Sequence, residues 1–157
     1  MIEKVEKAVQ ERWVPSFKYE RNETSVFTRL NKPLEQSKGV IITTGGVYVK
    51  GQPPFQDHYG LGDPSYREIK HDVSYDQLSI AHEHYDHTKA NEDRNVVFPL
   101  EILKHLSEEG TIGSIADVHY SFMGYVPIPH PLKKVTAKEV AEKLQLQQVD
   151  FAILVPS

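Results

Sequence analysis

The chain has 157 residues, of which 39% are apolar and 25% charged, and its formal net charge is −4. This length predicts one domain covering residues 1–157, and the composition excludes a disordered or fibrous chain. The sequence has no apolar run of the ~20 residues that a membrane span needs, no secretory signal and no basic patch for nucleic acid, so we expect a cytoplasmic protein. It also has no cysteine, which excludes disulfides, thiolate metal sites and thiol nucleophiles within these residues.

The N-terminal residues have the spacing of an amphipathic helix. Apolar side chains recur three or four positions apart, at Ile2, Val5, Val9 and Trp13. This predicts a helix that ends near Pro15 and docks on the edge of the domain. Residues 16–38 are polar and aperiodic, which favours an extended surface segment with one short strand around residues 25–28.

Short apolar runs predict the strands. Residues 39–44 (GVIITT) are rich in β-branched side chains and bounded by glycines, as in a strand buried on both faces. Residues 47–51 (VYVKG) form a second strand or continue the first, and residues 77–82 (QLSIAH) are typical of another buried strand. Between them, the glycines and prolines of residues 51–74 predict a long ordered loop.

The C-terminal half combines helices with a final strand. Residues 99–109 and 136–147 predict helices, the second with the capping-box spacing of Thr136 and Glu139. Residues 114–131 are ambiguous between a strand and a short helix, and residues 149–155 are typical of a central parallel strand. This order predicts an α/β fold, a Rossmann-like three-layer domain with a mostly parallel sheet.

Three histidines lie within six residues, in the string His82-Glu83-His84-Tyr85-Asp86-His87. If the strand continues into this segment, His82, His84 and Asp86 point to one side at its carboxyl end. Imidazole and carboxylate groups there suit a zinc or iron site, or acid/base and substrate-binding chemistry without metal. A hydrogen-bonded histidine turn with a structural role is the other interpretation.

The spacing of the cluster is similar to the HxHxDH motif of the metallo-β-lactamase superfamily. That resemblance implies a metal-dependent hydrolase with His82, His84, Asp86 and His87 as ligands. The superfamily usually needs a longer chain and further ligands downstream, and the contexts of His119 and His130 differ from its pattern. The hydrolase therefore stays an alternative hypothesis.

Several separated strings, in the right order, resemble the glycine/sarcosine/betaine/D-proline reductase family, in its selenoprotein B branch. The resemblance covers the chain from about Thr24 onward, and the string SFMGY is similar to the D-proline reductase-like members. The strings are KPLEQSKGVIITTGGVYVKGQPPF, DPSYREI, HEHYDH followed by Asp93 and Asn95, FPLEIL, EEGTIGSIA, HYSFMGYVP and VDFAILVP.

The resemblance implies an oxidoreductase subunit that reductively cleaves a carbon–nitrogen bond of an amino acid or amine. In this family the nucleophile is selenocysteine or cysteine in a U/C-x-x-C motif, and a neighbouring thiol resolves the selenenyl sulfide. It also implies two partners, a subunit with a pyruvoyl group that activates the substrate amine and a thioredoxin-type or dithiol electron donor.

The redox motif of the family begins where this sequence stops, at Ser157. We therefore expect selenocysteine at position 158 of the native protein, because a UGA codon read as stop ends the product one residue earlier. A short paralogue without redox chemistry, acting as a binding subunit, is the alternative. In either case we expect the fold to be incomplete at its C-terminus, with apolar surface exposed or covered in a homo-oligomer.

The resemblance also suggests site residues. We expect His82, Asp86 and His87 to hold the substrate or protonate its leaving amine. Recurring polar or backbone-shaping positions of the family correspond to Tyr85, Asp93, Asn95, Gly45, Gly46, Met123 and Gly124, and the first six of these are our candidates for substrate binding. The position of His84 is variable in the family.

Overall fold

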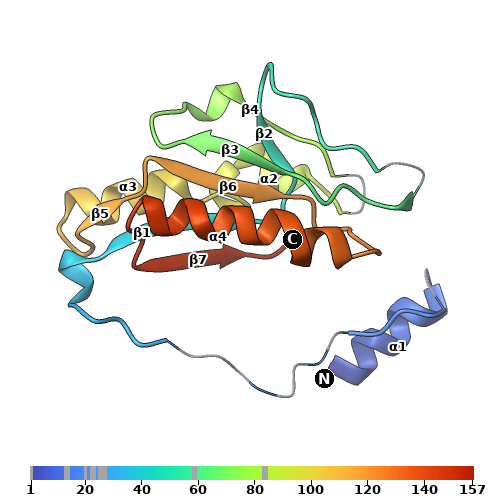
Figure 1. The fold of residues 1–157 in the computed structure, drawn as a ribbon. Coiled ribbons are helices and arrows are strands. Elements are labelled where there is room, and N and C mark those ends of the chain that lie inside the picture. The colour runs from blue at the N-terminus through green and yellow to red at the C-terminus, as the bar shows by residue number, and fades with distance from the viewer. Residues whose placement is uncertain are drawn as a thin grey trace.

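The computed structural model describes residues 2–12, 15–19, 21, 24, 28–57, 60–82 and 85–157. Its centre is a sheet around β1 (Lys38–Thr43) (Figure 1). On one side β1 pairs in parallel with β5 (Ser114–Ile115) and then β6 (Val118–Phe122), and on the other with β7 (Phe151–Val155). β3 (Tyr66–Lys70) is antiparallel to β6. The predicted α/β class with a mostly parallel sheet is confirmed.

Helices cover both faces of this sheet, because successive side chains of a strand point to opposite faces. Val40 and Ile41 of β1 are both fully buried. Val40 packs in the core beneath α4 (Ala137–Leu146), while Ile41 packs in the core that contains Leu100 and Leu103 of α3 (Leu100–Glu108). The result is the expected three-layer arrangement.

A second, two-stranded sheet lies beside the first. β2 (Val47–Val49) pairs antiparallel with β4 (Leu78–Ile80). The strand predicted over 77–82 therefore forms as β4, but it ends at Ile80, belongs to this small sheet and is fully buried only at Leu78. The loop predicted over 51–74 was wrong in part, because it contains β3, which begins two residues after Pro64 at the edge of the main sheet.

Both helices predicted in the C-terminal half form. The helix predicted from Thr136 starts earlier, because a π-helical turn, η5 (Leu132–Thr136), runs directly into α4. The Thr136 hydroxyl donates to the Pro64 carbonyl at 2.7 Å, so the predicted capping box does not form. Among the described residues there are also the shorter turns and helices η1 (Leu34–Gln36), η3 (Tyr75–Gln77), α2 (Thr88–Glu92) and η4 (Arg94–Val96).

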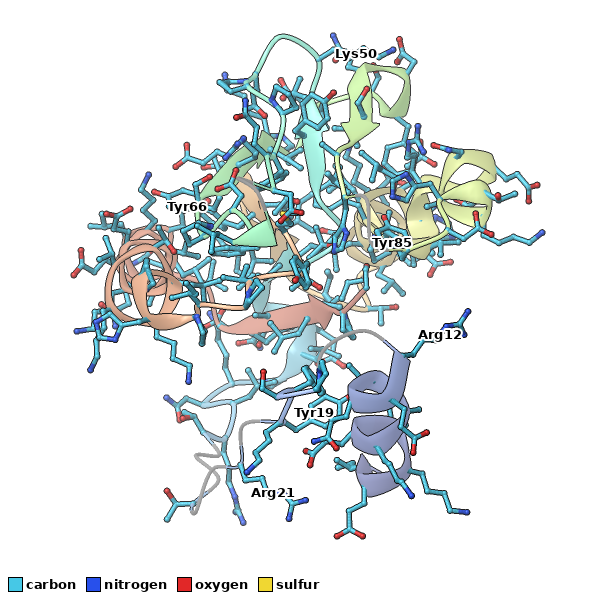
Figure 2. The ribbon with its side chains drawn as sticks, turned by 90° about the vertical axis from the view of Figure 1, so that its right-hand side faces the viewer. Arg12, Tyr19, Arg21, Lys50, Tyr66 and Tyr85 are labelled. Atoms are coloured by element: carbon cyan, nitrogen blue, oxygen red, sulfur yellow. The ribbon has the colours of Figure 1, made fainter. Side chains whose placement is uncertain are left out.

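The N-terminal helix α1 (Ile2–Arg12) forms as predicted but does not dock on the sheet. None of its described residues is buried, and Figure 1 shows it away from the main body. Its bonds are local, since Glu6 accepts from the Tyr19 backbone N–H at 2.9 Å (Figure 2). Trp13 and residues 25–27, on which two predictions fall, lie outside the described residues. The described helices are all too short or too polar to cross a bilayer.

The last strand, β7, lies at an edge of the sheet and not at its centre as predicted. Among the described strands it pairs with β1 alone. Its inward side chains Phe151, Ile153 and Val155 pack against the core, whereas Ala152 and Leu154 are exposed. The run resembles a central strand because its outward side chains Ala152 and Leu154 are apolar too, although they are exposed in this structure.

A buried histidine joins β6 to β1 where regular pairing is interrupted. β1 pairs with β5 through Gly39 and with β6 from Ile42, so the Ile41 N–H lies between the two ladders. His119 Nδ1 accepts that N–H at 3.0 Å, and the imidazole is fully buried with its ring centroid 6.0 Å from that of Phe98. The side chain thus replaces a missing carbonyl in the sheet.

Candidate functional site

The candidate site lies where the carboxyl ends of three strands meet. Gly124 follows β6, Thr44 follows β1 and Ser157 follows β7. A Cβ placed on Gly124 would lie 2.7 Å from Nε2 of His82, 2.8 Å from the Ser157 carbonyl oxygen and 3.1 Å from the Thr44 carbonyl oxygen. The Ser157 N–H also donates to the Thr44 hydroxyl at 3.0 Å. The imidazole of His82 therefore lies beside the end of β7, at the edge where α/β sheets place their sites.

His82 reaches this edge from the small sheet. It follows β4 by two residues, and its side chain is only 3% exposed. Because β4 ends at Ile80, the strand alternation predicted for His82, His84 and Asp86 does not hold. The small sheet instead packs so that His82 lies near the ends of β1, β6 and β7, and its role in a site stays a prediction.

Gly45 and Gly46 connect the two sheets at this point. The Gly46 N–H donates to the Phe122 carbonyl and its own carbonyl accepts from the Ala81 N–H, both at 2.9 Å. Gly46 has φ +65, and a Cβ there would lie 2.6 Å from the Ala81 carbonyl oxygen and 2.8 Å from Cβ of His82. Only glycine suits both the conformation and the contact. This turn therefore fixes the distance between β6 and the segment that carries His82.

Replacing Gly46 by alanine should displace this segment. We expect a loss of about 1 kcal/mol from the left-handed backbone and about 1–3 kcal/mol more from the contact with Ala81. Gly110→Ala is the matched control, because Gly110 has φ +75 and its Cβ would meet no atom within 4 Å. Urea unfolding measures both variants, and equal losses would contradict the proposed contact.

Tyr85 and His87 pack around His82. The Tyr85 ring lies edge-on to both histidines, with centroids 4.9 Å from His82 and 4.4 Å from His87. Its hydroxyl donates to the Gly45 carbonyl at 3.0 Å, and His87 Nε2 is hydrogen-bonded to the His82 carbonyl oxygen. The Tyr85 side chain is partly buried. Burial raises the pKa of the Tyr85 hydroxyl, so it stays a neutral donor.

Removing the Tyr85 hydroxyl tests this packing. Tyr85→Phe keeps the ring contacts with His82 and His87 but leaves the Gly45 carbonyl without its donor. We expect the free energy of unfolding to fall by about 1 kcal/mol. Tyr19→Phe, at an exposed tyrosine beside α1, should stay within about 0.5 kcal/mol of the parent protein. Equal unfolding midpoints of the two variants in urea would contradict the role given to the hydroxyl.

Asp86 caps the following helix. Its carboxylate accepts from the backbone N–H of Thr88 at 2.9 Å and from the Thr88 hydroxyl at 2.6 Å. These bonds, the hydroxyl first, lower the pKa of the Asp86 carboxyl. The residue is exposed, and its described bonds hold the start of α2. The structure thus gives Asp86 a local capping role and places His82 deeper in the protein.

Asp93 and Asn95 form a second cap, near the start of α3. The Asp93 carboxylate accepts from the backbone and side-chain N–H groups of Asn95, at 2.9 and 3.0 Å. Asn95 in turn accepts from the Tyr75 hydroxyl at 2.7 Å, and that hydroxyl accepts from the Glu101 N–H at 3.0 Å. These bonds tie η4 to the start of α3 and are separate from the contacts around His82.

The metal hypothesis requires His84, which lies outside the described residues. Within the described ranges, no group of three or more histidine, aspartate or glutamate side chains is arranged to hold a metal ion. The Asp86 carboxylate accepts from the Thr88 N–H at the start of α2, and the His87 imidazole is hydrogen-bonded to the His82 carbonyl oxygen. A metal site formed by His82, His84, Asp86 and His87 therefore stays a prediction.

Two hollows lie near this edge of the sheet, and together they add residues that sequence reasoning missed. The first, of about 260 Å³, is lined by Phe55, Gln56, Asp57, Ala81 and Met123. The second, of about 180 Å³, is lined by Tyr85, Asp86, Lys89, Ala90, Val96, Val97, Pro156 and Ser157. Of the predicted binding residues, Met123 and Tyr85 line a hollow. Thr44 and Ser157 had a usable signal in the sequence, since Thr44 ends one predicted strand and Ser157 follows another.

Comparison with known proteins shows the family of this chain. The family model described as Glycine/sarcosine/betaine reductase selenoprotein B (GRDB) matches residues 6–157. The chain belongs to this selenoprotein B family. The resemblance in the sequence is thereby confirmed over nearly the whole chain.

Curated relatives of this family carry the names of reductase subunits. The chain is 30% identical over 129 residues to D-proline reductase subunit gamma of Acetoanaerobium sticklandii, covering 82% of this chain and 52% of the relative. It is 32% identical over 135 residues to glycine reductase complex component B subunit gamma of Symbiobacterium thermophilum, covering 78% and 29%. It is 27% identical over 128 residues to betaine reductase complex component B subunit beta of Peptoclostridium acidaminophilum, covering 78% and 28%.

The chain thus spans about half of the first selenoprotein B relative and less than a third of the other two. No solved structure gives a significant match.

Proposed function

We propose that this chain is part of a reductase subunit that cleaves a carbon–nitrogen bond of an amino acid or amine. The observation that carries the proposal is the position of His82 near the end of β7, on either side of Gly124. Nε2 of His82 and the Ser157 carbonyl oxygen would lie 2.7 and 2.8 Å from a Cβ on Gly124, so a residue after Ser157 would start close to the imidazole. The names of the relatives, which are subunits of D-proline, glycine and betaine reductases, support the reaction class.

We place the redox nucleophile, selenocysteine or cysteine, in the chain that follows Ser157. The space there suits it, because Gly45 and Gly124 have no side chains and a Cβ on either would lie within 3.2 Å of an atom of Ser157. An imidazole next to a thiol or selenol favours the ionised, nucleophilic form. Such a nucleophile supplies the bond-forming chemistry, and a second thiol resolves the oxidised product.

The residues of this chain then have distinct tasks. His82 holds the leaving amine or gives it a proton, which is the acid/base role that a buried imidazole at a strand end can perform. Tyr85 and His87 keep the His82 segment in place through the Gly45 carbonyl and the His82 carbonyl. We propose that a partner subunit provides a pyruvoyl group that activates the substrate amine, and that a dithiol or thioredoxin-type protein supplies two electrons.

Two measurements test the proposed function. The first is the coding sequence after Ser157, where we expect a UGA or cysteine codon and a second cysteine within a few residues. The second is dithiol-dependent reduction of D-proline, glycine, sarcosine and betaine by the full-length protein with its co-purifying subunits. An ordinary stop codon and no activity would instead favour a binding subunit, and stoichiometric zinc or iron in the natively purified protein would favour the hydrolase.

A further inference from the structure

The last strand, β7, is covered on one face only. Phe151, Ile153 and Val155 pack against the core beneath α3. Ala152 and Leu154 point to the opposite face and are exposed, Leu154 by 70%. Apolar side chains on both faces suit a strand that is buried on both faces. The second face of β7 therefore lacks, among the described residues, the cover that its side chains suit.

The uncovered face is the one that α4 covers elsewhere in the sheet. Ala152 is paired with Val40, which is fully buried in the core beneath α4. Leu154 is paired with Ile42, which packs against the same core. Paired residues of neighbouring strands point to the same face. The cover that α4 provides therefore ends between β1 and β7.

The contacts of α4 explain why it stops there. Lys143 of α4 is hydrogen-bonded to Glu68 of β3, and the Gln147 side chain at the end of α4 donates to the Tyr120 hydroxyl of β6 at 3.1 Å. These bonds draw α4 toward the β3 edge of the sheet. In Figure 1, α4 lies in front of the sheet and β7 is drawn below it. The edge of β7 that faces away from β1 also has no partner among the described strands.

The handedness of chain crossovers links the open edge to the uncovered face. A crossover between parallel strands of one sheet is right-handed, so its direction across the sheet decides which face its helix covers. From β6 past β1 to β7, the helix is α4, on the face of Val40. From β1 in the opposite direction to β5 and β6, the helix is α3, on the face of Ile41. A further step outward from β7 repeats the first direction, so its helix covers the face of Ala152 and Leu154.

The relatives have enough chain for such a step. The matched part of this chain covers 52% of D-proline reductase subunit gamma and 29% of glycine reductase complex component B subunit gamma. A strand–helix–strand unit needs about 30 residues, and β7 already provides the first strand.

We propose that the chain after Ser157 forms a helix that lies beside α4 over Ala152 and Leu154, followed by a strand that pairs in parallel with the open edge of β7. This rests on the proposed function, in which the protein continues beyond Ser157. It places the proposed redox nucleophile in the loop between β7 and the new helix. That loop lies at the carboxyl ends of the strands, near His82.

Thiol reactivity of the full-length protein tests whether this face is covered. Residues 1–157 contain no cysteine, so an introduced thiol can be followed once any cysteine or selenocysteine after Ser157 is replaced by serine. We expect Leu154→Cys to react with a maleimide at least about tenfold more slowly than Leu146→Cys, because a covered thiol reacts only when its cover opens. Ala152→Cys should be protected to a similar degree.

Leu146 is the matched control because it is 83% exposed and lies three residues after Lys143, on the side of α4 that faces β3. Equal rates at the two positions would overturn the proposal. Protection that is lost on dilution, or on removal of residues 1–12, would also overturn it, because the cover would then be a second copy or α1.

Amide exchange of the full-length protein tests the added strand. The N–H groups of β7 that point away from β1 should exchange as slowly as those bonded to β1, and fast exchange would contradict the pairing. Both measurements are independent of turnover. An inactive protein with a protected Leu154→Cys thiol would contradict only the proposed function, and an active protein with a reactive thiol would contradict only this inference.

Discussion

Replacing His82 by glutamine is expected to lower the turnover of the complete reductase by about 10²–10⁴-fold, with a much smaller effect on substrate affinity. We expect a rate loss of this size because proton transfer from a general acid to the leaving group contributes about 10²–10⁴-fold to the rate. Glutamine keeps the size and polarity of the side chain at this buried position but has no proton to transfer. The measurement is kcat and KM for D-proline or glycine with a dithiol donor.

Two controls separate this effect from a structural one. His105→Gln changes an exposed histidine of α3 that is paired with Glu109, and it should leave turnover unchanged. Urea unfolding of His82→Gln should show that the variant is folded at the assay temperature. A folded variant with parental kcat would remove His82 from the reaction and leave it the structural role of holding the end of β4.

Acidification is expected to destabilise the protein through His119, well before the carboxylates become protonated. Burial, and then the positive charges of His71 and Lys104, lower the pKa of His119 to about 4 from its ordinary value of 6.5. The unfolded chain therefore binds a proton between pH 6.5 and 4 that the folded protein does not. Stability is complete above pH 6.5 and is lost as the pH falls to 4, by about 3 kcal/mol in total.

The geometry explains why protonation is so unfavourable. Nδ1 of His119 accepts the Ile41 N–H, so a proton on this nitrogen would break the bond and place a charge in the core of the sheet. Urea unfolding at pH 7.5 and 5.0 should show a difference of about 2 kcal/mol from this group. His119→Asn, in which an amide oxygen can accept the same N–H without titrating, should lose that difference. An unchanged pH dependence in His119→Asn would assign the effect to another histidine.

Local sequence patterns were sufficient to predict most of the helices and strands. The β-branched run of residues 39–44 between glycines predicted β1, and the leucine spacing from Leu100 to Leu106 predicted α3. They were insufficient for β3, because its residues 66–70 follow a stretch rich in glycine and proline and need β6 as a partner. They also misplaced β7, since apolar composition reports burial of a strand but not its neighbours.

For the candidate site, too, local patterns identified segments but did not show which residues come together. The string from His82 to His87 identified the segment, and Gly45, Gly46 and Met123 were predicted to shape it. The strand alternation expected for His82 and Asp86 was wrong, because β4 ends before them and Asp86 caps α2. Sequence spacing could not show that Phe55 and Asp57 form a wall beside Met123, because these contacts join residues more than sixty positions apart.

By itself, the sequence determined the α/β class, the family and the segment that carries the histidines, because composition, periodicity and short strings are properties of neighbouring residues. The tertiary structure decided which of these residues meet. The Gly46 turn and the packing of two sheets bring His82 to Gly124 and Ser157, at the ends of three strands. That convergence depends on long-range hydrogen bonds and close backbone contacts, which only the folded chain can form.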